Sequence, residues 1–427
     1  MAHDIAVWLY DQPVGTLSLV GGRLSFQYAL EWLAKPSATG LSQSLPPRPE
    51  PFDDPHCRAF FAGLLPEGNL RRLIAQQCQV SSQNDFALLN AIGGECAGAV
   101  TFVPAGQPLT TGEPVGVEWL DKAQLAALLD ELPRRPMLAG RDGIRLSLAG
   151  AQDKLPVVFD GRRIGLPKGN EPSTHILKPA IAAVEDSVLN EAFCLAMAQA
   201  MGLPAAQAQI FKVGERQVLL VTRYDRRAGD DGTPTRLHQE DFCQALGVVP
   251  EMKYQNEGGP ELKACFDLLR KATRPSAPQV LKLLDAVVFN ALIGNHDAHA
   301  KNFSLLYAST TPTLAPLYDL LSTAVYAHLT PKMSMKLGSK YKFAEVQARH
   351  WEQFAQAAGL SKAQTRKRVL RMAQNLPRAA GELQLSPPFA GQPSVSGIVA
   401  LIAQRSALTV RRLTEGESNV QDEVGDS

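Results

Sequence analysis

The part of the chain that most constrains its fold is residues 276–304, where an apolar helical pattern runs directly into a polar cluster. Apolar side chains recur at helical spacing from residue 276 to residue 293, and Gly294 ends the pattern. Six side chains with hydrogen-bonding or metal-binding groups follow within eight residues: Asn295, His296, Asp297, His299, Lys301 and Asn302. This pattern predicts a buried helix that belongs to the folded core and positions a catalytic or binding site at its end.

Length and composition indicate a folded protein with a net charge close to zero. The 427 residues are enough for two or three packed units, and a hydrophobic content of 45% supports a sizeable core. The formal net charge of +1 argues against a broad nucleic-acid-binding surface. The six cysteines form no C-x-x-C pair, and the sequence shows no signal-peptide pattern or membrane-spanning run. These features predict a cytoplasmic protein with reduced cysteines and no membrane association.

The chain divides into an α+β part followed by a helical part. Residues 5–28 have the pattern of three short strands, and Asp160-Gly161 joins two more strands in a hairpin. From about residue 240 the pattern becomes helical. The predicted domains are residues 1–108, 109–245 and 246–412, with the first boundary at 105–116 and an acidic, disordered tail at 413–427.

Asp297 and Asn302 have the spacing of a phosphotransfer loop. A carboxylate in such a loop can accept a hydroxyl proton, and an amide oxygen five residues later can bind a metal ion. Asp319, seventeen residues beyond Asn302, is placed to supply a second oxygen ligand for that metal. The D-x-x-x-x-N pattern is weak by itself, and Asp319 has the alternative role of capping a helix that follows it.

The order of features along the chain strengthens a kinase interpretation. A kinase needs a phosphate loop, a strand lysine, a helix glutamate, a hinge, a catalytic Asp, an Asn and a metal-binding Asp. The chain offers candidates in that order: Ala149–Lys154, Lys178, Glu191, Glu240–Phe242, Asp297, Asn302 and Asp319. Ordinary structural explanations remain open, because Lys178 can be a strand-end lysine and Glu191 a solvated helix residue.

Metal-dependent phosphoester hydrolysis is the competing interpretation of the polar cluster. The G-N-H-D sequence at residues 294–297 is typical of a metallophosphoesterase strand end, but the other metal-binding motifs of that class are missing. The segment before Gly294 also has a helical pattern, whereas such a motif follows a strand. No Gly-Lys dipeptide occurs, so the sequence contains no Walker A loop. These points favour the kinase interpretation.

Several motifs together resemble the HipA family of bacterial toxin–antitoxin serine/threonine protein kinases. The matching stretches are S-L-A-G-A-Q-D-K at 147–154, T-H-I-L-K-P at 174–179, Q-E-D-F-C-Q-A-L-G at 239–247, G-N-H-D-A-H-A-K-N-F-S at 294–304 and L-Y-D-L-L-S-T at 317–323. F-A-G-L-L-P-E-G at 61–68 is similar to the N-terminal module of that family. The resemblance implies an α+β, protein-kinase-like fold of two lobes, one a mostly antiparallel sheet and one helical, with an N-terminal α+β module.

The resemblance also implies roles for individual residues. Asp297 would be the catalytic base, and Asn302 and Asp319 would bind Mg²⁺. Lys178 would contact the ATP phosphates, and Ser147 matches an autophosphorylated serine whose modification switches the kinase off. The other residues implied in nucleotide binding, followed by the candidate for orienting the lysine, are Ala149, Gly150, Ala151, Gln152, Asp153, Lys154, Glu240, Asp241, Phe242, His299, Ala300, Lys301, Tyr318 and Glu191.

Three positions depart from the family pattern. Asp153 replaces the usual Glu, while His296 and Ala298 stand where Thr or Ser and Arg are expected. Activity is still expected, because the carboxylates and Lys178 remain. The family implies a HipB-like helix-turn-helix antitoxin, operator DNA bound mainly through that complex, and a protein substrate such as glutamate–tRNA ligase or another aminoacyl-tRNA synthetase. A catalytically silent member that binds its antitoxin and DNA as a corepressor is the second interpretation.

Overall fold

The computed structural model describes residues 3–104, 116–141, 143–229 and 232–424. The chain forms two compact units. Unit 1 comprises Met1–Ile181, Phe211–Glu251 and Ser304–Pro312, and unit 2 comprises Ala182–Ile210, Met252–Phe303 and Thr313–Ser427. The predicted boundary at 105–116 lies within unit 1 and almost wholly outside the described residues. The predicted domain limits therefore stay predictions.

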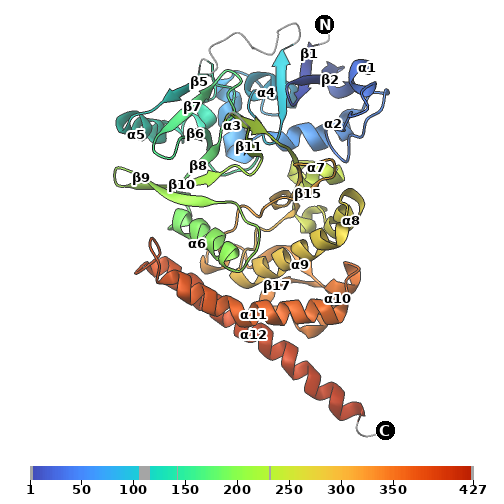
Figure 1. The fold of residues 1–427 in the computed structure, drawn as a ribbon, viewed down its shortest axis with the longest axis vertical. Coiled ribbons are helices and arrows are strands. Elements are labelled where there is room, and N and C mark those ends of the chain that lie inside the picture. Colours follow the sequence, from blue (N-terminus) through green and yellow to red (C-terminus); the bar gives the residue numbers. More distant parts are fainter. Residues whose placement is uncertain (1–2, 105–115, 142, 230–231, 425–427) are drawn as a thin grey trace. The chain divides into compact units, whose positions relative to one another are not determined.

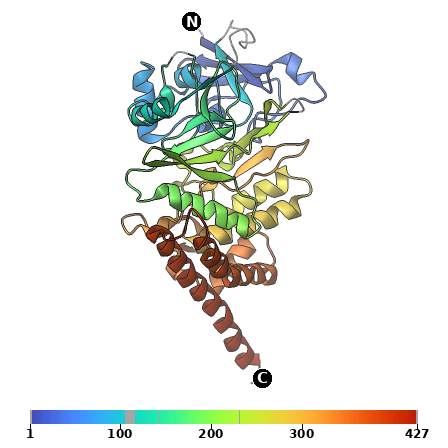
Figure 2. The same ribbon diagram turned by 60° about the vertical axis from the view of Figure 1, so that its left-hand side comes forward.

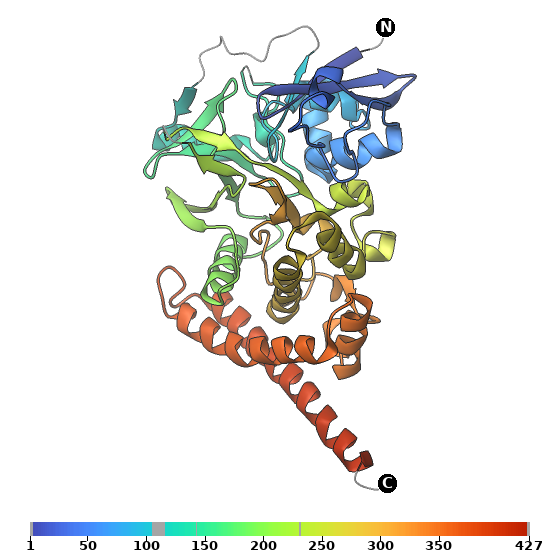
Figure 3. The same ribbon diagram turned by 45° about the vertical axis from the view of Figure 1, so that its right-hand side comes forward.

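The first sheet of unit 1 is the predicted meander, to which a fourth strand is added (Figure 3). Its order is β3-β2-β1-β4, with strands β1 (His3–Leu9), β2 (Gln12–Val20), β3 (Arg23–Tyr28) and β4 (Val100–Pro104). Alternation along β1 buries Ile5, Val7 and Leu9. The connection from β3 to β4 contains helices α1 (Leu30–Leu33), α2 (Asp54–Phe61), α3 (Gly68–Gln77) and α4 (Asp85–Ile92).

The second sheet has six strands in the order β5-β7-β6-β8-β10-β9. The strands are β5 (Gly116–Trp119), β6 (Leu155–Phe159), β7 (Ile164–Lys168), β8 (His175–Pro179), β9 (Ala208–Val213) and β10 (Arg216–Thr222). The predicted hairpin is confirmed, because β6 pairs antiparallel with β7 and the Asp160 carboxylate accepts hydrogen bonds from the backbone of Arg162 and Arg163. Asp121 caps helix α5 (Lys122–Glu131) in a capping box with Gln124.

Two short strand pairs complete unit 1. Strand β11 (Arg226–Ala228) pairs with β12 (Pro234–Arg236), and β13 (His238–Asp241) pairs with β14 (Ser304–Tyr307), both antiparallel. Asp241 ends β13 and caps helix α7 (Phe242–Leu246) in a capping box with Gln244. The predicted hinge therefore lies at a junction between a strand and a helix.

Unit 2 is mostly helical, and α9 is its core helix (Figure 1). The helices are α6 (Ser187–Ala200), α8 (Leu262–Ala272), α9 (Ser276–Ile293), α10 (Ala348–Ala357), α11 (Lys362–Gln384) and α12 (Pro393–Val424). The predicted extent of α9 is confirmed, and its N-cap is Pro275. By length and composition α9 could cross a membrane, contrary to expectation, but 61% of it is buried inside the protein, as is usual for a core helix.

Two parts of unit 2 differ from what the sequence predicted. Strands β16 (Lys332–Leu337) and β17 (Lys340–Lys342) form an antiparallel pair within the stretch expected to be mostly helical. Helices α11 and α12 lie side by side (Figure 2), and α12 continues through most of the segment predicted to be disordered. Extending an existing helix adds a hydrogen bond per residue without a new nucleation step, which explains this continuation. The remaining short elements are β15 (Thr313–Leu314), η1 (Ala62–Leu64), η2 (Pro136–Leu138), η3 (Pro250–Met252), η4 (Gln255–Glu257), η5 (Ala300–Asn302), η6 (Thr323–Val325) and η7 (Phe343–Glu345).

Candidate active site

The predicted phosphate loop in unit 1 is held by backbone hydrogen bonds from the N-terminal module. The Glu95 amide donates to Arg145 O (2.8 Å), and the Ser147 amide donates to Glu95 O (2.9 Å). On the far side of the loop, the Glu67 amide donates to Gly150 O (3.1 Å). Gly150 has φ +108°, a conformation that favours glycine. Main-chain atoms therefore fix the segment from Arg145 to Gly150, which leads into the loop and forms its beginning.

Two side chains of the 147–154 segment, Ser147 and Lys154, are buried and donate hydrogen bonds to backbone carbonyl groups. Ser147 is fully buried, and its hydroxyl donates to Leu64 O at 2.9 Å. Lys154 Nζ donates back to Ala149 O at 2.5 Å. Burial raises the pKa of the Asp153 carboxyl, and its Oδ1 has no hydrogen-bond partner among the described residues. In this conformation Ser147 is out of reach of a phosphate donor, so its modification requires the loop to move.

A buried ion cluster lies directly behind the phosphate loop. The Glu95 carboxylate accepts from Arg226 (2.6 Å), Arg236 (2.6 Å) and Arg223 (3.3 Å), and from the Ser173 hydroxyl (2.8 Å). Burial by itself raises the pKa of Glu95, but the three guanidinium groups outweigh that effect and hold the pKa well below its usual range. Because the backbone of Glu95 also pairs with the loop, the cluster anchors the residue that supports Ser147.

The predicted strand lysine and hinge are also in unit 1. Lys178 is buried in β8, the strand between β6 and β10. The Glu240 carboxylate accepts from the Ser42 hydroxyl, the Gln43 amide (3.0 Å) and the Tyr307 hydroxyl (2.5 Å). Burial raises the pKa of Glu240 to about 7, against the opposing effect of these donors. The Glu240 side chain therefore fastens the 42–43 segment of the N-terminal module.

The other predicted hinge side chains are also engaged in the fold. Asp241 forms the α7 capping box, and Phe242 is fully buried. In a hinge of this kind the backbone groups are the ones that can reach a ligand. The predicted nucleotide role of Glu240–Phe242 therefore concerns main-chain atoms and stays a prediction.

In unit 2, Asp297 lies in a loop closed by short-range hydrogen bonds. Its amide donates to Asn295 Oδ1 (3.1 Å), and its carbonyl accepts from the His299 amide (2.8 Å) and from Asn302 Nδ2 (2.9 Å). The Tyr254 hydroxyl donates to Asp297 Oδ1 at 2.9 Å, and the Asp297 side chain remains 53% exposed. The predicted base therefore has one oxygen fixed by a tyrosine while its side chain stays open to an incoming group.

Two side chains tie the predicted second metal ligand to this loop. Asn295 Nδ2 donates to Asn290 Oδ1 in α9 (2.8 Å) and to Asp319 O (3.2 Å), and the Tyr318 hydroxyl donates to Lys301 O (2.7 Å). Asp319 has φ +50°, a strained conformation of the kind that clusters at functional sites. The next helix, η6, has Ser322 as its N-cap, so the alternative role of Asp319 as a helix cap is wrong.

The oxygen atoms of Asn302 and Asp319 are of the kind that bind a hard divalent cation. Asn302 uses its Nδ2 to bind the loop, which leaves its amide oxygen as an acceptor, and Asp319 supplies carboxylate oxygens. Oxygen ligands of these two kinds suit Mg²⁺. His299, Ala300 and Lys301 are buried in unit 2. Their predicted place near the phosphates stays a prediction.

His296 is not arranged to bind a metal. Its Nε2 lies 2.8 Å from the Arg405 guanidinium, and its Nδ1 lies 3.0 Å from Thr330 O. A guanidinium has only donors and a carbonyl only accepts, so the ring carries its proton on Nδ1 and Nε2 accepts from Arg405. No group of three or more His, Cys, Asp or Glu side chains suited to a metal occurs among the described residues. The geometry thus argues against the two-metal hydrolase interpretation.

Glu191 is placed in unit 2, whereas Lys178 is in unit 1. Glu191 is buried in α6, so its alternative as a solvated helix residue is wrong. Its predicted role in orienting the lysine stays a prediction.

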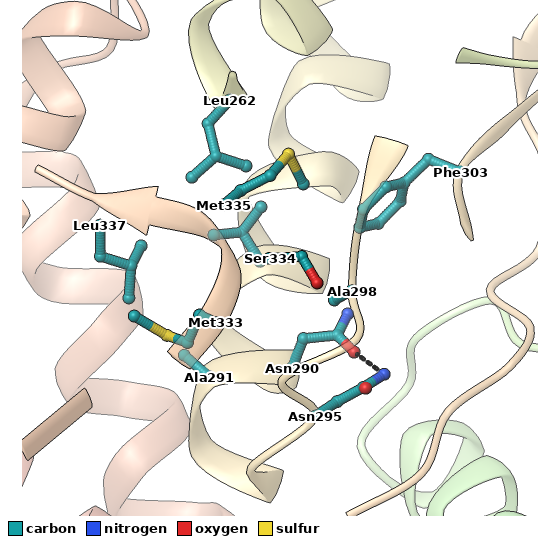
Figure 4. A pocket seen from close by; sticks show the side chains of 11 residues that line it. Leu262, Asn290, Ala291, Asn295, Ala298, Phe303, Met333, Ser334, Met335 and Leu337 are labelled. Carbon is teal, nitrogen blue, oxygen red and sulfur yellow. Dashed lines mark hydrogen bonds between the residues drawn. The ribbon is translucent and has the colours of Figure 1, made fainter. Parts of the chain in front are cut away.

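A small cavity lies beside the predicted catalytic loop (Figure 4). Its volume is about 30 Å³, and its walls include Asn290, Asn295, Ala298 and Ser334. Such a volume admits roughly one water molecule, so the cavity does not accommodate a nucleotide. Ala298, where the family pattern predicts arginine, contributes only a methyl group to the wall.

Sequence reasoning missed the residues that support the site. Asn295 was noticed only as part of the polar cluster, and Tyr254 and Arg405 were not singled out. Asn295 carried a usable signal, because an amide next to a helix-ending glycine often bonds the surrounding backbone. Tyr254 and Arg405 lie 43 and 108 residues from Asp297, and no local pattern links residues so far apart.

Known proteins provide a comparison for this arrangement. Residues 5–103 match the HipA N-terminal domain, and residues 146–380 match the HipA-like C-terminal domain. Over 368 residues, which are 85% of this chain and 87% of the relative, the chain is 46% identical to Y4mE of Sinorhizobium fredii, which is named as a kinase. Over 343 residues, 77% of each protein, it is 30% identical to the serine/threonine-protein kinase toxin HipA of Shewanella oneidensis.

A solved structure supports the same conclusion for the fold. It contains HipA of Shewanella oneidensis in complex with HipB and operator DNA. The match has a TM-score of 0.85 and 26% identity, and it covers 96% of this chain and 98% of that one. The predicted α+β fold is therefore confirmed. The chain belongs to the HipA family, as its motifs predicted, and one of its relatives in that family is named as a serine/threonine-protein kinase toxin.

Proposed function

We propose that this chain is an ATP- and Mg²⁺-dependent serine/threonine protein kinase that acts as the toxin of a type II toxin–antitoxin system. The observation that carries the proposal is the arrangement in unit 2. The Asp297 side chain is exposed and can meet the hydroxyl group of a substrate, and Asn295 bonds both the Asp297 amide and the Asp319 carbonyl. The serine/threonine kinase toxin among the relatives supports it further.

In the proposed reaction, Asp297 accepts the proton of a serine or threonine hydroxyl. The hydroxyl oxygen then bonds to the γ-phosphorus of ATP while the bond from that phosphorus to the ADP oxygen breaks. Asn302 and Asp319 would hold Mg²⁺, which neutralises phosphate charge when it is bound. Tyr254 fixes Asp297 Oδ1, so the second carboxylate oxygen is the one that meets the acceptor. Lys178 would contribute positive charge toward the phosphates.

The proposal extends to regulation and partners. Ser147 is the proposed autophosphorylation site, and its burial means that phosphorylation would hold the loop outside its observed position. A HipB-like helix-turn-helix antitoxin is the proposed partner, with operator DNA bound mainly through that complex, in keeping with the HipA–HipB–DNA assembly of the structural relative. An aminoacyl-tRNA synthetase such as glutamate–tRNA ligase is the proposed substrate.

The central test uses the purified full chain with radiolabelled ATP and Mg²⁺. We expect phosphate incorporation in the wild type and a loss of about 1,000-fold in Asp297→Asn, because a positioned base contributes 10²–10⁴-fold. Asp267→Asn is the matched control, since Asp267 lies on α8 in a surface ion pair with Lys263. A wild-type chain that never incorporates phosphate would reject the kinase proposal.

The silent corepressor gives a different outcome in cells. Expression of the kinase alone should arrest growth, and co-expression of the antitoxin should relieve the arrest. The corepressor instead predicts no toxicity and full operator repression in Asp297→Asn. Phosphoproteomics after induction would identify the substrate, and absence of any synthetase among the phosphorylated proteins would reject that part of the proposal.

A further inference from the structure

Arg405 of α12 links the end of α9 to the start of the catalytic loop. One terminal nitrogen of its guanidinium donates to Ala291 O in the last turn of α9 (2.7 Å), and the other donates to His296 Nε2 (2.8 Å). The Phe343 ring lies against the guanidinium, 4.4 Å from ring centroid to Arg405 Cζ. Arg405 is thus held by an aromatic face while both ends of its fork are used.

His296, the residue before the catalytic base, is fixed at every polar atom. In addition to its ring contacts with Arg405 and Thr330, its amide donates to Thr323 Oγ1 (2.8 Å). Its carbonyl accepts from both the amide (2.8 Å) and the hydroxyl (2.6 Å) of Ser334. Such complete satisfaction of a buried polar residue favours a single backbone conformation.

Close packing of α12 on this loop requires Gly294. Its φ is +77°, and a Cβ added there would lie 2.7 Å from the Ala324 Cβ, 2.9 Å from a Leu401 methyl and 3.4 Å from the Arg405 guanidinium carbon. A larger residue would push α12 away from the loop. The glycine that ends α9 therefore also lets α12 reach His296.

We infer that Arg405 and His296 form a positioning pair through which helix α12 sets the orientation of Asp297. The inference rests on the proposed function, because it takes Asp297 as the base. Neither residue touches the reacting atoms. They fix the backbone at residue 296, and this sets the direction of the next side chain. The pair also explains the departure at position 296, since a Thr or Ser there would be too short to reach the guanidinium.

The test compares Arg405→Ala, Arg405→Lys and the control Arg411→Ala, which alters an exposed arginine of the same helix. We expect Arg405→Ala to lower kcat for phosphate transfer by about 10- to 100-fold, because small displacements of a catalytic group are this costly. The Kd for ATP should change less than about twofold. Added guanidinium at millimolar concentration should restore part of the lost kcat. Arg405→Lys should remain low, because a single ammonium does not replace the fork.

A second measurement is independent of activity. Two-bond ¹H–¹⁵N spectra should show the His296 ring protonated on Nδ1 in the wild type, and a changed Nε2 signal in Arg405→Ala. Wild-type kcat in Arg405→Ala, or a loss of kcat that accompanies a loss of ATP binding and is not rescued by guanidinium, would overturn the inference. A wild-type chain without phosphate transfer would reject the proposed function instead, while the spectra would still report on the pair.

Discussion

The predicted phosphate loop of unit 1 and the catalytic loop of unit 2 are held in different ways. In unit 1, the backbone amides of Glu95, Ser147 and Glu67 donate the hydrogen bonds that fix the loop, so the loop is held mainly by main-chain atoms. In unit 2, the side chains of Asn295 and Asn302 close the loop around Asp297. Main-chain hydrogen bonds survive most substitutions, whereas side-chain hydrogen bonds depend on the identity of one residue.

This difference teaches where each region is sensitive to mutation. The phosphate loop should tolerate changes in its own side chains, except at Gly150, where φ is +108°. It should lose its conformation when its support in the N-terminal module is removed. The catalytic loop should fail at single polar residues that leave the fold intact. Four substitutions test the contrast.

The largest loss of stability is expected for a substitution of Glu95, whose backbone pairs with the segment that leads into the phosphate loop. Glu95→Gln keeps the size of the side chain but removes the charge that binds the buried guanidinium groups of Arg223, Arg226 and Arg236. Arg223 and Arg226 keep the Asp225 carboxylate as a partner, whereas Arg236 loses the carboxylate with which it pairs. Removing one partner from a buried ion network typically costs about 3–5 kcal/mol in the free energy of unfolding. Urea denaturation at pH 7 measures the loss.

Glu118→Gln is the matched control for Glu95→Gln. Glu118 pairs with Arg141 (2.8 Å) and Lys168 (3.0 Å), but all three side chains are partly exposed. Exposed ion pairs contribute about 0–1 kcal/mol, so this variant should lose little. Equal losses in the two variants would show that burial of the Glu95 cluster has no special effect.

Asn295→Ala tests the side-chain half of the contrast. The substitution removes the acceptor for the Asp297 amide and the donor to Asp319 O. We expect kcat for phosphate transfer to fall by about 100-fold, because the base and the proposed metal ligand lose their common anchor. Asn375→Ala is the control, since Asn375 Nδ2 donates only to Arg371 O within its own helix. A kcat within threefold of the wild type would contradict the role assigned to Asn295.

Glu240 makes the free energy of unfolding depend on pH, and the sign of this dependence follows from the burial of its carboxyl group. Its pKa in the folded chain is about 7, above the usual value of 4.5, so its contribution to stability is complete below about pH 4.5 and is lost as the pH rises through 7. Between pH 5 and pH 8 the wild type should lose about 2 kcal/mol of unfolding free energy relative to Glu240→Gln. Burial lowers the pKa of both His175 and His238 to about 4, so these residues stay neutral over that interval.

Urea denaturation of the wild type and Glu240→Gln at several pH values tests this expectation. The difference between the two proteins isolates Glu240 from the groups that they share. A difference that stays constant from pH 5 to pH 8 would show that the carboxyl titrates normally in the folded chain.

Local patterns predicted much of the fold, while the chemistry assigned to the site stays a prediction. The apolar spacing of residues 276–293 predicted α9, and Asp160-Gly161 predicted a hairpin, because both signals lie within a few residues. The alternation of Met333, Met335 and Leu337 before Gly338 indicated β16 equally well and was overlooked. Contacts such as Arg405 with His296 join residues that are close only in the folded chain, so no spacing rule predicts them.

The smallest effect is expected for Ser147→Ala. The Ser147 hydroxyl makes one hydrogen bond to Leu64 O, while the Ser147 and Glu67 amides continue to hold the loop. Loss of one such bond costs about 1 kcal/mol, so the variant should fold, bind ATP and transfer phosphate to an external substrate at the wild-type rate.

Under the proposed function, Ser147→Ala should lose only the autophosphorylation that switches the kinase off. Time courses should show the wild type slowing as it gains phosphate, while Ser147→Ala stays active. Ser309→Ala, in an exposed turn, serves as the control and should slow like the wild type. If Ser147→Ala instead loses ATP binding, a side chain rather than the main chain holds the phosphate loop, and the contrast between the two regions is wrong.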